Sequence, residues 1–136
     1  MISVAFAALI AVAVGSGDAQ PTDGRFRPCA RPPGVESVRV RAELPKPLRA
    51  KFRDVAMPGE YWNGGDAGLP GSGFDFIWHR GNRWVVLIGR GGFATMFGVR
   101  AFDVSNDGRS AQELPVRNSP FESQFLCELA TSYFNP

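Results

Sequence analysis

The only histidine of the chain, His79, is the first residue whose type could support catalysis. A hydrolase would use it as a general base, with Asp75 on the same face of the predicted strand to orient the ring. Ser72 is the nearest candidate nucleophile, but Gly71-Ser72-Gly73 lacks the G-x-S-x-G spacing of a nucleophile elbow. The incomplete set favours a non-enzymatic protein, and a small hydrolase using His79 with Asp75 is the alternative.

Two further patterns partly match metal and nucleotide sites. The run from Asp103 to Gly108 follows the first half of an EF-hand loop, but its twelfth position is Leu114 instead of the bidentate glutamate. Gly89-Arg90-Gly91-Gly92 precedes a strand-like run, whereas a dinucleotide fingerprint needs a helix there. The sequence therefore predicts a turn at each place, and neither a metal nor a cofactor.

A recognition surface is the remaining candidate site. Aromatic rings beside guanidinium groups suit stacking on sugars or gripping an anionic group. The surface requires the Gly-rich loop 57–73 to fold over a hairpin turn; in the alternative, its two aromatics fold back into the core. The candidate binding residues are Tyr61, Trp62, His79, Arg80 and Arg83.

The charge balance argues against nucleic acid as a partner. The chain has 15 basic and 13 acidic residues, giving a net charge of +2. The arginines are scattered and no run of five basic residues occurs, so no nucleic-acid patch is predicted.

The N-terminal segment predicts export. Residues 2–14 form an apolar run of signal-peptide length, although no Lys or Arg precedes it. Cleavage is expected after Ala13 or Ala19, and the alternative is an uncleaved anchor or an N-terminal helix. We expect a signal peptide over 1–19, a Pro/Arg-rich arm over 20–35 and one domain over 36–136. The mature chain, without a transmembrane span, would be periplasmic or secreted, with an envelope or extracellular protein or glycan as its partner.

The two cysteines, Cys29 and Cys127, fit that compartment. An even cysteine count behind a signal peptide predicts a disulfide, which here would tie the N-terminal arm to the C-terminal segment. A zinc site would need more ligands than two cysteines and one histidine supply.

The hydropathy pattern predicts an α+β fold with a mainly antiparallel sheet of about five strands, in the order β-α-β-β-β-β-α. A capping box, Ser119-Pro120-Phe121-Glu122, starts the C-terminal helix, whose apolar stripe runs to Tyr133. The other predicted elements are a strand over 36–44, a helix over 47–55 ended by Pro58-Gly59, a hairpin over 74–88, a strand over 93–104 with a bulge or bend at Gly98, and an edge strand over 109–114.

The hairpin over 74–88 allows two registers, which exchange its faces. A three-residue loop, Arg80-Gly81-Asn82, sets Trp78 opposite Trp84, with Asn82 in the left-handed conformation. A two-residue Gly81-Asn82 turn sets Trp78 opposite Val85 instead. We favour the first register. Both faces carry apolar residues in either case, which predicts a central hairpin covered on two sides.

Overall fold

The computed structural model describes residues 28–63, 68–91, 96–117 and 124–135. The predicted signal peptide, the capping box at 119–122 and the start of the strand predicted from Phe93 lie outside these ranges.

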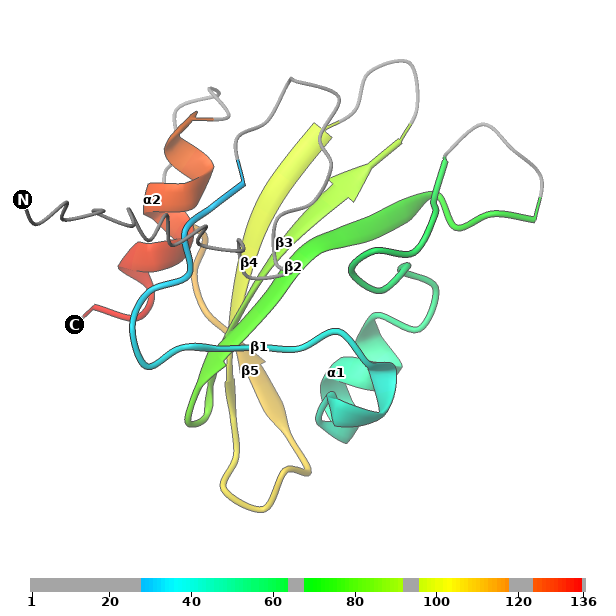
Figure 1. Ribbon diagram of the computed structural model, residues 1–136. Helices are drawn as coiled ribbons and strands as arrows, with labels where there is room; N and C mark the ends of the chain where they lie inside the picture. The colour runs from blue at the N-terminus through cyan, green and yellow to red at the C-terminus, as the bar shows by residue number, and fades with distance from the viewer. Residues whose placement is uncertain (1–27, 64–67, 92–95, 118–123, 136) are drawn as a thin grey trace, which may run out of the picture.

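A five-stranded antiparallel sheet forms the centre of the molecule, with its strands side by side in sequence order (Figure 1). A short helix follows the first strand and a second helix lies near the C-terminus, so the predicted α+β fold and its element order are confirmed. The elements are β1 (Glu36–Ser37), a 3-10 turn η1 (Arg41–Glu43), α1 (Lys46–Lys51), β2 (Ser72–Arg80), β3 (Arg83–Arg90), β4 (Met96–Val104), β5 (Ala111–Glu113) and α2 (Gln124–Ser132).

The hairpin of β2 and β3 adopts the two-residue register. Trp78 pairs with Val85 and Arg80 with Arg83, so the favoured three-residue loop is wrong. Gly81, not Asn82, takes the left-handed conformation, with φ of 56°. Glycine has no Cβ to clash there, and glycine at the first position of a two-residue turn matches the twist of the flanking strands.

The irregularity of the sheet is at Asp75 and not at Gly98. The β2–β3 register shifts between Phe74 and Phe76, leaving Asp75 as the extra residue. The β3–β4 register runs unbroken through the pair Ile88 and Gly98. The bulge turns Phe74 to the opposite face from the one that simple alternation gives.

The strand predicted over 36–44 is only two residues long. The chain leaves the sheet after Ser37 and forms η1, so Val40 is 55% exposed while Val38 and Leu44 stay buried. The alternating pattern therefore does not require a strand here, because a short strand followed by a 3-10 turn also buries Val38 and Leu44.

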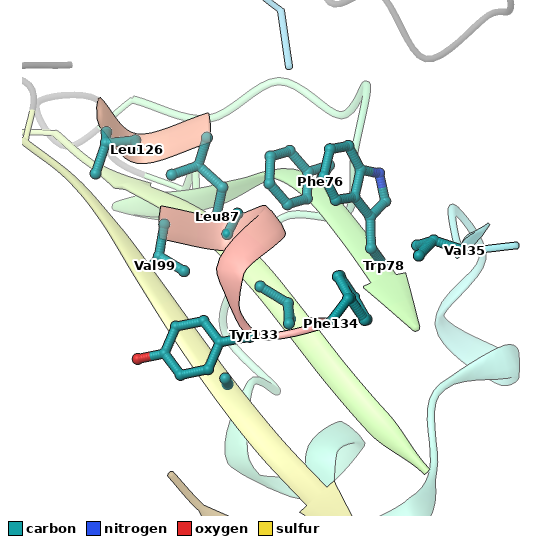
Figure 2. Close-up of a cluster of buried hydrophobic side chains, with 11 residues drawn as sticks. Val35, Phe76, Trp78, Leu87, Val99, Leu126, Tyr133 and Phe134 are labelled. Atoms are coloured by element: carbon teal, nitrogen blue, oxygen red, sulfur yellow. The ribbon is translucent and has the colours of Figure 1, made fainter. Parts of the chain in front are cut away.

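Two apolar layers cover the two faces of the sheet, as the hairpin pattern predicts. On one face, which we call the α2 face, α2 and the C-terminal residues pack on β2 to β4 (Figure 2). On the other, the α1 face, Leu48 and Phe52 pack on Ile77 and Trp84. Burial on both faces explains why this hairpin reads as nearly continuous hydrophobic sequence.

The predicted disulfide is confirmed: Cys29 is bonded to Cys127, 98 positions away in sequence, and their Cα atoms are 5.2 Å apart. It joins the segment before β1 to the middle of α2. In the described ranges, no helix has the length and hydropathy that a membrane crossing requires.

Candidate functional site

The structure places the predicted binding residues at opposite ends of the sheet. We call the end at Gly81-Asn82 the turn end, and the end at Ser72, Arg90 and Met96 the loop end (Figure 1). Trp62 lies against Gly73, whereas His79 is six strand residues further, about 20 Å away at 3.3 Å per residue. The described part of the loop at Trp62 therefore lies away from the hairpin turn, and the five residues do not form one surface.

Trp62 lies on a platform made by two paired glycines, Gly73 and Gly89. A Cβ on Gly73 would collide with the five-membered ring of the indole, and one on Gly89 would lie 2.7 Å from its six-membered ring. Gly89 is in phase with Leu87, so Trp62 is on the α2 face. The fit is steric: the indole occupies the space that two side chains would fill.

The loop end of the sheet also exposes apolar side chains. Tyr61 is 78% exposed, Met96 69% and Leu69 38%. Asn63 N–H donates to Pro70 O at 3.0 Å, which brings Tyr61 and Leu69 to the same part of the loop. Met96 starts β4 opposite the end of β3. Three of the five large hydrophobic side chains that are exposed among the described residues therefore gather at this end.

His79, at the turn end, is held between β1 and β3. Its Nε2 lies 3.1 Å from Glu36 Oε2, and its ring stacks on Trp84 with centroids 4.2 Å apart. Asp75 is four strand residues away, about 13 Å at 3.3 Å per residue, too far for a hydrogen bond. The structure therefore pairs His79 with Glu36 and does not assemble the expected pair with Asp75.

Arg80 and Arg83 hold the C-terminal end of α2. The last carbonyls of a helix lack partners within it and carry partial negative charge, so guanidinium groups stabilise them. A third arginine, Arg117, does the same from the segment after β5. Arg117 Nη1 donates to Ser132 O at 2.9 Å, Arg83 Nη1 to Tyr133 O at 2.8 Å and Arg80 Nη2 to Phe134 O.

Arg83 also forms a bidentate ion pair with Asp103, with Nε to Oδ1 at 2.5 Å and Nη2 to Oδ2 at 3.1 Å. Asp103 is the first residue of the run that partly matches a calcium loop, and its carboxylate is paired with the Arg83 guanidinium. At Asp107, hydrogen bonds from the Ser105 hydroxyl and then the Arg109 N–H lower the carboxyl pKa. Among the described residues, no group of three His, Cys, Asp or Glu side chains is arranged to hold a metal ion.

Asp75, at the bulge, is a half-buried carboxyl group. Burial raises its pKa above the ordinary value of 3.8, because the charged form loses hydration. A bulge beside a half-buried carboxyl often marks a site. Here no described His, Cys, Asp or Glu cluster accompanies it.

Sequence reasoning missed the partners that occupy the turn end: Glu36 for His79, Asp103 for Arg83, and the α2 carbonyls for all three arginines. Glu36 and Asp103 stand directly opposite their partners across antiparallel pairs. The two-residue turn fixes only the β2–β3 register and the turn at 105–108 only the β4–β5 register, so neither signal gives the Arg83–Asp103 pair across β3 and β4. Nothing in the sequence indicates that the arginines donate to backbone carbonyls at the end of α2, because every residue has such a carbonyl.

Comparisons of this chain with protein families, with curated proteins and with solved structures found no match.

Proposed function

We propose that this chain is a small exported, non-enzymatic domain that binds an envelope or extracellular protein or glycan through its loop end. The observation that carries the proposal is the exposure of Tyr61, Leu69 and Met96 at this end of the sheet. Aromatic and methionine side chains are enriched at the centres of interfaces, where their burial supplies affinity.

The contacts at the turn end also favour the loop end as the binding surface. The imidazole of His79 and the guanidinium groups of Arg80 and Arg83 already have partners inside the domain. A ligand at that end would compete with these internal contacts, whereas a ligand at Tyr61 would displace only water.

Export is part of the proposal. The apolar run at residues 2–14 and the Cys29–Cys127 disulfide support it, because disulfides persist in the periplasm and outside the cell. Fractionation of the producing cells, with intact mass of the recovered chain, tests it: we expect a chain shortened by 13 or 19 residues outside the cytoplasm. A full-length chain confined to the cytoplasm would contradict export.

The binding experiment places a photo-crosslinking amino acid at position 61 of the exported protein, and at exposed position 109 in a control. We expect a defined product from position 61, weakened when Met96 or Leu69 is replaced by Ala. The captured partner is then purified and titrated against the wild type and Tyr61→Ala, which should bind at least tenfold more weakly. Equal products from positions 61 and 109, or equal affinity of wild type and Tyr61→Ala, would overturn binding at the loop end.

A further inference from the structure

The outer side of α1 carries a concentration of cations. Residues 39–54 contain six basic and two acidic residues, a net charge of +4, whereas the whole chain has +2, so the remainder carries −2. Lys46 and Arg49 lie three residues apart, on one side of the helix, and Arg53 follows in the turn after it. Leu48 and Phe52 occupy the buried side. We call Lys46, Arg49 and Arg53 the basic face of α1.

These cations differ from the arginines at the turn end because they have no strong internal partner. Lys46 and Arg49 are exposed, and their side chains make no hydrogen bond or ion pair with described residues. Arg53 approaches only its neighbour Asp54, at 4.0 Å, with both side chains more than four-fifths exposed. Such an exposed pair contributes little, so the three charges are available to an external anion.

The helix that carries the basic face is firmly attached. Leu48 and Phe52 are at most 2% exposed. Arg41 donates to Phe52 O at 3.0 Å and to Val55 O at 2.5 Å, which fastens η1 to the end of α1. Val40, the residue before Arg41, is 55% exposed. A fixed group of cations therefore has an exposed aliphatic side chain in the adjoining turn.

We propose that the basic face of α1 docks the protein on an anionic lipid surface. A single phosphate or carboxylate is bound by donors that converge on it, often as a bidentate fork. The cations of α1 are instead spread along one side of a helix, which matches a surface of many separate headgroups. Val40 suits the boundary between headgroups and acyl chains, where an apolar side chain gains burial.

The test is sedimentation of the purified, oxidised protein with vesicles of phosphatidylcholine containing phosphatidylglycerol, and with vesicles of phosphatidylcholine alone. We expect binding to the first only, and release as NaCl rises from about 0.05 M to about 0.5 M, because salt screens exposed charges. Lys46→Gln with Arg49→Gln should weaken binding about 25-fold, since each cation near an anionic surface contributes about fivefold.

A matched control removes the same net charge elsewhere. Arg90 and Arg109 are exposed, and their replacement by Gln should change vesicle binding less than threefold, while unfolding curves of both double variants match the wild type. Equal weakening by the two double variants would show a general charge effect and overturn the assignment to α1. Binding of an acidic polysaccharide or peptide that depends on Lys46 and Arg49, with none to either vesicle, would overturn the lipid assignment.

Discussion

The two ends of the sheet use polar and apolar side chains in opposite ways. At the turn end, His79, Arg80 and Arg83 are joined to Glu36, to Asp103 and to backbone carbonyls beyond α2. At the loop end, Tyr61 and Met96 are directed mainly to water. The residues that suggest recognition in the sequence therefore stabilise the fold at the turn end, whereas at the loop end their side chains are exposed to solvent.

The residue type of a side chain alone therefore does not show whether it binds a ligand or stabilises the fold. An arginine can serve a ligand or a helix terminus with the same five N–H donors. What separates the two uses is whether acceptors of the same chain lie within reach. At the turn end they do, because α2 ends there (Figure 1).

The largest expected effect concerns the disulfide, which holds α2 independently of the turn-end arginines. Replacing Cys29 and Cys127 by Ser should lower the free energy of unfolding by about 4 to 5 kcal/mol in the chain-entropy model. Urea unfolding of the oxidised wild type and of the double variant measures it. A loss below about 1 kcal/mol would mean that the arginines and apolar contacts alone hold α2.

The next effect separates the two ends directly. Arg83→Ala removes a bidentate ion pair and a helix-carbonyl hydrogen bond and leaves Asp103 without its cation. We expect a loss of about 2 kcal/mol in unfolding free energy, because hydrogen bonds to charged groups contribute about 1.5 to 3 kcal/mol. Arg90→Ala at the loop end should change it by less than about 0.5 kcal/mol. Equal losses would remove the distinction between the ends.

A smaller effect tests the glycine platform. Gly73→Ala should destabilise by about 1 to 2 kcal/mol, because its methyl group and the Trp62 indole claim the same space. Gly98→Ala, whose Cβ would meet nothing within 4 Å, is the matched control and should be near neutral. In a Trp62→Ala background, Gly73→Ala should lose most of its cost. An unchanged cost in that background would show that Trp62 does not rest on the platform.

The smallest effect is a pH dependence at Asp75. Its folded pKa is raised by burial, so its charged form destabilises the fold. This penalty develops as pH rises from the unfolded value near 3.8 through the folded pKa and is complete above it. Asp75→Asn should therefore stabilise at pH 7 by less than about 1 kcal/mol, because solvent screens a half-exposed group. The advantage should vanish at pH 3. Thermal unfolding at both pH values measures it, and a constant difference would contradict the assignment to the Asp75 charge.

Much of the fold follows from local patterns. The hairpin of β2 and β3, the turn before β5 and the apolar stripe of α2 each depend on residues close in sequence. The register of the hairpin does not, because Gly81-Asn82 and Arg80-Gly81-Asn82 are both plausible loops. The observed register places Trp84 on the α1 face, stacked on His79 across the strands, while Trp78 is on the α2 face.

Periodicity, turn residues and a count of two cysteines are enough to predict the element order, the antiparallel sheet and the pairing of Cys29 with Cys127. Three contacts depend instead on how the chain packs: Trp62 on Gly73 and Gly89, His79 with Glu36, and Arg80 and Arg83 with the carbonyls at the end of α2. These contacts join segments up to 54 residues apart. They form because the packing of α2 and of Trp62 on the sheet brings together groups that are distant in sequence, and no local pattern records such contacts.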